Sequence, residues 1–146
     1  MIRKIQNTDR EFFLSAADEF YHTDAVEKPL PAVQLEAVFE EIMRSDVYLE
    51  GFIFECGGER AGYSVIAKTF HTEAGMSIWI EDIFILPQYR GRGLGGELFA
   101  YLDKNYAGRF RRFRLEAEPE NKAAVRLYEK NGFRFLPYSS MVKDIQ

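Results

Sequence analysis

A strand that runs into a glycine-rich corner and then a helix is the feature that most restricts how this chain can fold. Residues Ile80 to Gly96 read IEDIFILPQYRGRGLGG, so an apolar stretch precedes Pro87 and glycines follow at positions 91, 93, 95 and 96. The first turn of a helix carries unpaired backbone N–H groups and the positive end of the helix dipole, and it therefore attracts anions. Glycines leave these N–H groups uncovered. The stretch predicts a phosphate site, fed by a strand that carries Glu81 and Asp82.

Length and composition narrow the class of protein. A chain of 146 residues predicts one domain over residues 1–146, and 47% hydrophobic residues exclude general disorder. No apolar run approaches the ~18 residues of a membrane span, and the N-terminus lacks the pattern of a signal peptide, so we expect a cytoplasmic protein without a membrane partner. One cysteine and two histidines predict neither an internal disulfide nor a metal site. The net charge of −4 argues against a nucleic-acid partner.

The spacing of apolar residues predicts the element order βααβββαβαββ. This order indicates an α/β domain of the α+β type, with a mixed, mostly antiparallel sheet flanked by helices. Thr8 or Asp9 is expected to cap the first helix. The expected strands cover residues 2–5, 48–56, 62–70, 77–86, 113–117, 133–135 and 140–143, and the expected helices cover 10–21, 33–43, the glycine corner to 106, and 120–131.

Two other phosphate motifs compete with this interpretation. A P-loop requires a Gly-Lys pair, which the chain lacks. The dinucleotide pattern G-x-G-x-x-G does match at Gly91, Gly93 and Gly96, and Glu116 follows at the distance expected for a ribose-binding acid. However, three expected antiparallel strands precede these glycines, and the 50 residues after Gly96 are too few for the remaining βαβ units. The dinucleotide interpretation is therefore disfavoured.

Two motifs together resemble the GNAT family of N-acetyltransferases. The family's acetyl-CoA motif, Q/R-x-x-G-x-G/A, matches the segment from Gln88 to Gly93 directly after the strand. A second family motif, N-x-x-A-x-x-L-Y-x-x-x-G-F, matches the segment from Asn121 to Phe133. The resemblance covers about Tyr48 to Phe135 and is closest to the diamine and polyamine acetyltransferases. It implies a GNAT fold whose central strands are splayed, and acetyl-CoA as the co-substrate.

The resemblance also implies which residues hold acetyl-CoA. The amides of the glycine corner would bind the pyrophosphate, and the main chain of the preceding strand would pair with the pantetheine arm in the splayed gap. Asn121 and its neighbours would hold that arm from the other side. Arg90 and Arg92 flank the corner and suit phosphate contacts. The expected cofactor-binding residues are Ile83, Phe84, Ile85, Arg90, Gly91, Arg92, Gly93, Leu94, Gly95, Gly96, Asn121 and Ala124.

Transfer of an acetyl group to an amine requires a proton acceptor, which explains why carboxylates lie beside this site. An alkyl amine with a pKa near ~10.4 is neutral in only about one molecule in 2,500 at pH 7, a handicap of roughly 4.6 kcal/mol. A carboxylate can bind the cation and accept its proton. Neighbours on a strand point to opposite faces, so we expect Glu81 to accept the proton and Asp82 to help hold the cation. By resemblance Tyr128 lies near the thioester sulfur, where a hydrogen bond would stabilise the departing thiolate.

The acceptor remains open at this point. Asp24 and Glu27 lie in the region that borders the acceptor pocket in this family, where acidic residues suit a diamine or polyamine. The chain shows no serine or cysteine nucleophile with a histidine partner, so we expect direct attack by the amine in a ternary complex. A peptide or protein amine is the alternative acceptor. A non-catalytic acyl-CoA-binding module is the alternative of another class, and a homodimer is common in the family.

Overall fold

Within residues 1–145, five strands form one sheet and four α-helices flank it. The computed structural model of the chain describes residues 1–145. Its elements are β1 (Ile2–Lys4), η1 (Asn7–Asp9), α1 (Arg10–Phe20), α2 (Ala32–Arg44), β2 (Leu49–Cys56), β3 (Glu59–His71), β4 (Gly75–Ile85), η2 (Pro87–Tyr89), α3 (Leu94–Tyr106), β5 (Arg112–Arg114) and α4 (Lys122–Lys130). The strands lie in the order β1-β2-β3-β4-β5, and every pair is antiparallel except β4 with β5. The predicted fold class is confirmed.

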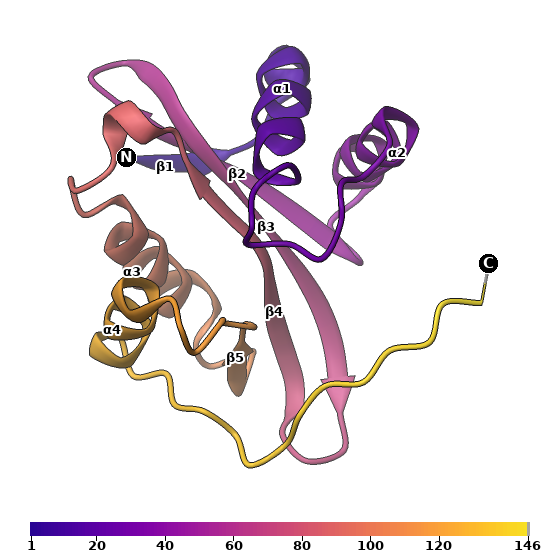
Figure 1. Cartoon of the computed structure of the whole chain (residues 1–146), viewed down its shortest axis with the longest axis vertical. Helices are drawn as coiled ribbons and strands as arrows, with labels where there is room; N and C mark the ends of the chain where they lie inside the picture. Colours follow the sequence, from indigo (N-terminus) through magenta and orange to yellow (C-terminus); the bar gives the residue numbers. More distant parts are fainter. Residues whose placement is uncertain (146) are drawn as a thin grey trace.

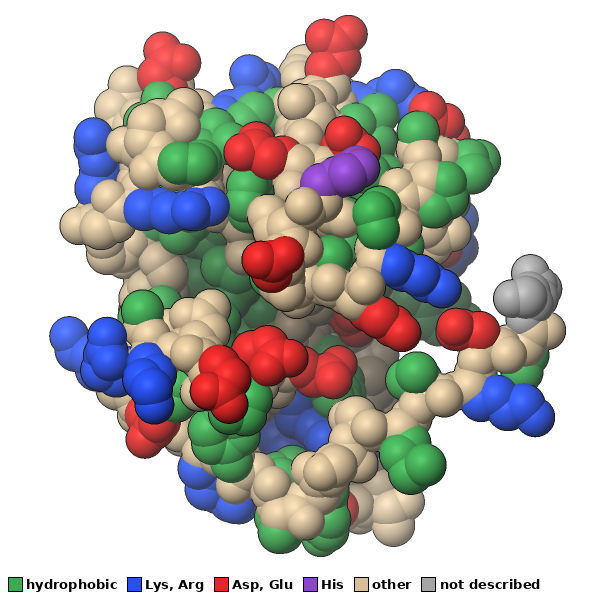
Figure 2. Space-filling model, viewed as in Figure 1, with side chains coloured by type: hydrophobic (Ala, Val, Ile, Leu, Met, Phe, Trp, Pro, Cys, Tyr) green, Lys and Arg blue, Asp and Glu red, His purple; other side chains and the backbone are tan. Residues whose placement is uncertain are grey.

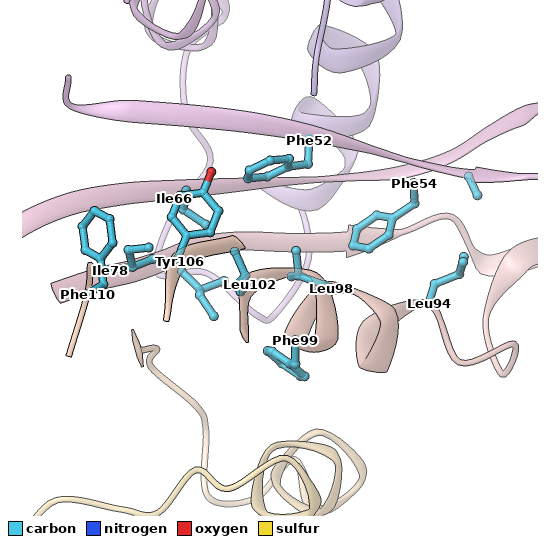
Figure 3. Packing of buried hydrophobic residues seen from close by; sticks show 12 residues of the cluster. Phe52, Phe54, Ile66, Ile78, Leu94, Leu98, Phe99, Leu102, Tyr106 and Phe110 are labelled. Carbon is cyan, nitrogen blue, oxygen red and sulfur yellow. The ribbon is translucent and has the colours of Figure 1, made fainter. Parts of the chain in front are cut away.

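The sheet separates two hydrophobic cores, because neighbouring side chains on a strand point to opposite faces. Phe52 and Phe54 on β2 pack with Leu98 and other residues of α3, whereas Ile53 between them packs with Phe13 and the other side chains of α1 and α2. Figure 3 shows the first of these cores, in which Leu98 and Tyr106 of α3 point at the sheet, whereas Phe99 points away from it, where it packs on Tyr128 of α4. Figure 1 shows α1 and α2 together on one side and α3 with α4 on the other.

The strand β4, which carries the expected proton acceptor Glu81, contains a β-bulge at that residue. Val65 on β3 pairs with Asp82, but the next residue, Ile66, pairs with Ile80, so Glu81 has no partner on β3. The extra residue changes which side chains face α3. Ile78 and Ile80 pack against α3 before the bulge, and after it the residues that face α3 are Ile83 and Ile85.

β4 separates from β5 soon after the two strands meet. They pair only between Ser77–Trp79 and Arg112–Arg114, and beyond Trp79 that edge of β4 has no strand partner within residues 1–145. The splayed gap expected from the resemblance is therefore present. Arg112 to Arg114 is also shorter than the strand expected over 113–117, since the chain leaves the sheet where the gap opens.

The two C-terminal strands expected over 133–135 and 140–143 do not form. After α4 the chain makes a turn at Gly132 and then runs to residue 145 without helix or strand. β5 offers an edge of only three residues, and Pro137 lacks the N–H group that a paired strand needs. The tail therefore has few main-chain partners, and Met141 and Val142 are 95% and 80% exposed. In Figure 1 the tail crosses the β3–β4 hairpin as an open trace.

Candidate functional site

The glycine corner forms the start of α3, as predicted. Gly91 and Gly93 have φ angles of 77° and 79°, a left-handed conformation that favours glycine, and Gly93 is the N-cap of the helix. A Cβ atom at Gly91, Gly93 or Gly96 would meet nothing within 4 Å, so the space before the first turn of α3 is open. Gly95 has a different reason to be glycine, because a Cβ there would lie 2.9 Å from Leu127 Cδ2 on α4. The corner combines open N–H groups with close packing of α4.

Two arginines lie beside this open space. The Arg90 Nε donates to the carbonyl oxygen of Ile85 over 2.8 Å, and the Arg92 guanidinium lies 5.5 Å from the ring centre of Tyr89. Neither arginine forms an ion pair with a carboxylate in the described part of the chain. Their positive charges are therefore not neutralised by the protein, as an anion site requires.

The unpaired edge of β4 leads from the gap to this corner. Phe84 is buried against α1 and α2, so only its main chain is available to a ligand in the gap. The Ile85 carbonyl is already occupied by Arg90. On the other side of the gap, the Asn121 side chain caps α4 by accepting from the Ala124 amide over 3.3 Å. The structure gives Asn121 a capping role, and the expected pantetheine contact stays a prediction.

Glu81 projects from the bulge, where β4 leaves β5. Its side chain reaches solvent and forms no hydrogen bond or ion pair within residues 1–145. Partial burial raises the pKa of the Glu81 carboxyl, and the nearby charges of Asp82 and Glu116 raise it further. A carboxylate with a raised pKa is a better proton acceptor than an ordinary surface glutamate.

Asp82, the next residue along β4, is buried on the side of the sheet that carries α1 and α2. Its carboxylate accepts hydrogen bonds from the hydroxyls of Tyr21 over 2.7 Å and Tyr63 over 2.9 Å, and its main-chain carbonyl accepts from the Ser64 hydroxyl. Burial raises the pKa of Asp82, and the two phenols partly oppose that shift. Because both oxygens are engaged, Asp82 joins the end of α1 to β4. This placement does not support the expectation that Asp82 contacts a cationic substrate.

Tyr128 lies half-buried on α4, with its ring 6.0 Å from Phe99 and 6.1 Å from Phe133. Its hydroxyl has no hydrogen-bond partner within residues 1–145, and burial raises its pKa. The residue lines a cavity of about 830 Å³ bounded by β5, α4 and the C-terminal tail. A phenol that keeps its proton and lacks a protein partner can donate to a developing anion.

The remaining acidic candidates lie in the loop between α1 and α2. Asp24 and Glu27 are exposed, and neither forms an ion pair in the described residues. Figure 2 shows acidic side chains on both sides of a hollow that crosses the middle of the molecule. The acidic side chains gather at the middle of this hollow and Lys and Arg side chains lie toward its ends, so its middle favours a cationic group.

Three site residues were missed from the sequence: Tyr21 and Tyr63, which hold Asp82, and Trp79, which lines the cavity. Nothing in the local pattern of Tyr63 or Trp79 separates them from ordinary strand aromatics. Only the pairing register, which puts Tyr63 opposite Phe84, brings its hydroxyl to Asp82 on β4. Within residues 1–145 no group of three or more His, Cys, Asp or Glu side chains is placed to hold a metal ion.

A strand that opens onto a glycine-started helix, with a carboxylate at the opening, defines an acyl-CoA-type transferase site. The sequence profile described as "Acetyltransferase (GNAT) family" matches residues 9–133. The chain belongs to this family and so to the acyltransferases.

The relatives by sequence are mammalian and bacterial acetyltransferases. The chain is 32% identical over 117 residues to thialysine N-epsilon-acetyltransferase of Sus scrofa, covering 68% of this chain and 66% of the relative. It is 30% identical over 120 residues to the Mus musculus protein of that name, covering 70% and 68%. The chain thus spans about two thirds of the length of these relatives. An uncharacterized N-acetyltransferase of Bacillus subtilis, YhfO, is 36% identical over 84 residues, which is 56% of each chain.

Solved structures show the same fold at lower identity. An integron cassette protein from the Cole Harbour Salt Marsh metagenome superposes with a TM-score of 0.83 at 20% identity, covering 99% of this chain and 90% of that one. The aminoglycoside N-acetyltransferase AAC(6')-Iy with a CoA bisubstrate analog gives 0.82 at 21% identity, covering 99% and 97%. No helix among residues 1–145 has the length and apolar character needed to cross a membrane.

Proposed function

We propose that the chain transfers an acetyl group from acetyl-CoA to a primary aliphatic amine by direct attack in a ternary complex. The observation that carries the proposal is the bulge at Glu81, at the point where β4 separates from β5. A carboxylate at that point, with one edge of β4 unpaired beside it, suits an amine that attacks a thioester lying along the strand.

The residues of the glycine corner fit CoA. The open N–H groups of the first turn of α3 and the unneutralised charges of Arg90 and Arg92 suit a pyrophosphate. The main-chain groups of Ile83 and Phe84 suit the amides of the pantetheine arm, which would bind as an added strand. A solved neighbour of the same fold binds CoA, which supports this assignment.

Glu81 is proposed to accept the proton of the amine, directly or through water, and Tyr128 to hydrogen-bond the thiolate of CoA. A thiol with a pKa near ~8.5 is a stronger acid than a phenol near ~10, so full proton transfer from Tyr128 would be uphill. The raised pKa of Tyr128 makes that transfer still less favourable. Stabilisation by a hydrogen bond, followed by protonation from solvent, is the consistent role.

The acceptor is proposed to be a small-molecule amine. The sequence relatives are named for an amine of an amino-acid analogue, thialysine, which supports a small aliphatic acceptor. The exposed carboxylates of Asp24 and Glu27 in the loop between α1 and α2 also favour a positively charged molecule. A peptide amine is the second candidate, because the hollow in Figure 2 is open at its ends.

A thiol-release assay with acetyl-CoA and a panel of diamines, polyamines and amino acids tests the proposal. We expect Glu81→Gln and Tyr128→Phe each to lower kcat by about 10- to 1,000-fold. Glu40→Gln, at an exposed position on α2, is the matched control and should behave as wild type. Binding of CoA without release of thiol for any amine or peptide would instead indicate an acyl-CoA-binding module.

A further inference from the structure

An arginine stacked on a tryptophan lies on the face of the sheet opposite α3. The Arg114 guanidinium is 4.4 Å from the ring centre of Trp79, and the Trp79 Nε1 donates to His71 Nε2 over 3.2 Å. Ile78 and Phe113 pack toward α3, so their neighbours Trp79 and Arg114 point to the other face. That face is the one away from the glycine corner and its helix.

Arg114 has no anionic partner in the described part of the chain. It is half-buried, and neither a hydrogen bond nor an ion pair of its side chain is found within residues 1–145. Arg112, two residues earlier on the same face, is instead paired with Glu73 at 3.2 Å. Stacking on Trp79 holds the flat face of the guanidinium and leaves its N–H edge available. An N–H edge of this kind binds a carboxylate through two parallel hydrogen bonds.

The two strands place this cation near the acidic residues of the proposed amine site. Arg114 pairs with Trp79, and each strand carries a glutamate two residues further on, Glu116 after β5 and Glu81 on β4. Two residues of extended chain span about 6 to 7 Å. A chain of four or five aliphatic carbons covers a similar distance. Arg114, Trp79, Glu116 and Tyr128 also line one cavity of about 830 Å³.

We propose that the acceptor is an amino acid with an aliphatic side-chain amine, whose carboxylate binds Arg114 while its amine faces Glu81 and Glu116. This inference rests on the proposed function and narrows its acceptor. Diamines and polyamines carry positive charge at both ends, so Arg114 would repel one end of such a molecule. An acceptor with a carboxylate at that end would instead form an ion pair with Arg114. Arg114 would therefore favour amino acids over diamines and polyamines.

The test compares two acceptors that differ only in the carboxylate, L-lysine and 1,5-diaminopentane. Thiol release gives kcat/KM for each, and we expect the wild-type protein to prefer L-lysine. Arg114→Gln should lower the lysine-to-diamine ratio of kcat/KM by about 10- to 100-fold, mainly through KM for lysine. Arg114→Lys keeps the charge but loses the planar edge, so it should lower the ratio less. Arg111→Gln, an exposed arginine next to β5, is the control and should keep the wild-type ratio.

The outcomes separate this inference from the proposed function. A wild-type preference for the diamine, or equal losses for both acceptors in Arg114→Gln, would overturn the role of Arg114 while leaving an active acetyltransferase. Absence of thiol release with every amine would refute the proposed function itself. CoA titration and thermal unfolding of each variant show whether a loss of activity comes from misfolding. If Arg114→Gln misfolds, the lysine-to-diamine ratio of Arg114→Lys tests the role of Arg114 instead.

Discussion

Gly62 lies directly against the strand that is proposed to bind pantetheine, so its replacement by alanine tests the site and the fold together. Gly62 on β3 pairs with Ile85, the last residue of β4, on the edge of β4 opposite to the unpaired one. A Cβ atom at this position would lie 2.2 Å from the carbonyl oxygen of Phe84 and 2.9 Å from the Cα of Ile85. Both obstructing atoms are main chain and cannot rotate away as a flexible side chain can.

The size of the effect follows from these distances. A carbon atom approaches a carbonyl oxygen no closer than ~3.3 Å in comfortable contacts, so β4 must move by roughly 1 Å near Phe84. Insertion of one methyl group into a packed region costs about 1–3 kcal/mol, and a main-chain obstruction puts Gly62→Ala at the upper end. For a domain of this length, a loss of about 3 kcal/mol lowers the Tm by roughly 9 °C. The same displacement moves the main chain of Phe84, so CoA should bind more weakly.

Urea unfolding of the ligand-free protein and CoA titration measure these two effects. Gly96→Ala is the control for unfolding, because its Cβ would meet nothing within 4 Å and alanine is about 1 kcal/mol better than glycine inside a helix. We expect Gly96→Ala to be as stable as wild type or slightly more so. If Gly62→Ala unfolds at the wild-type urea midpoint with an unchanged slope, the close packing of β3 against β4 and the estimate drawn from it are wrong.

Three further predictions concern charged and hydrogen-bonded groups. Glu116→Gln should shift the acid limb of the kcat/KM profile to lower pH, because the charge of Glu116 raises the pKa of Glu81; an unshifted limb would contradict this coupling. Asp9→Asn should destabilise the protein by about 3 kcal/mol at pH 7, since Arg3 and Arg60 bind the buried Asp9. Arg3 holds the pKa of Asp9 well below its usual range, so the stabilisation from Asp9 is present above pH ~4 and is lost as the pH falls further. Thermal unfolding at pH 7 and pH 3 tests this, because the difference in stability between Asp9→Asn and wild type should shrink at pH 3. Tyr63→Phe should lower the free energy of unfolding by about 1–2 kcal/mol in a urea titration, because the Asp82 carboxylate loses one of its two donors, and a value near zero would show that the bond contributes nothing.

Much of the fold followed from local patterns. A strand was expected over residues 48–56, and the structure forms it and places Phe52 and Phe54 in one core and Ile53 in the other. The strands expected over 48–56 and 62–70 are joined by a hairpin turn at Gly57 and Gly58, whose positive φ angles suit a tight turn. These features depend on neighbours in sequence, which is why the sequence was sufficient.

The bulge at Glu81 was not predicted, although the sequence carried a signal for it. Apolar residues alternate at Ile78 and Ile80 and again at Ile83 and Ile85, but the two series are out of phase by one residue. A strand that keeps one face against α3 must gain a residue between them. Strict alternation placed Glu81 and Asp82 on opposite faces, but the bulge puts both between Ile80 and Ile83, which face α3, so alternation fails at this point and Glu81 lies outside the pairing with β3.

The burial of Asp82 and the unpaired tail depend on residues far away in the sequence. Tyr21 is 61 residues from Asp82, and no local pattern indicates that its hydroxyl will meet this carboxylate. The tail was expected to form strands because Phe133–Phe135 and the segment 140–143 contain apolar residues. Whether such segments pair depends on an available sheet edge, and β5 offers only three residues.

The short pairing between β4 and β5 also affects which part of the molecule opens first. In the part of the chain that the structure describes, three residue pairs join β5 to β4, while β2, β3 and β4 are joined along most of their length. Segments held by few contacts open at lower free energy than the global transition. The part of the chain that carries Tyr128 and Arg114 would then open and close while the body of the protein stays folded. Such local opening would let a bulky CoA thioester enter and leave without unfolding the strand that orients it.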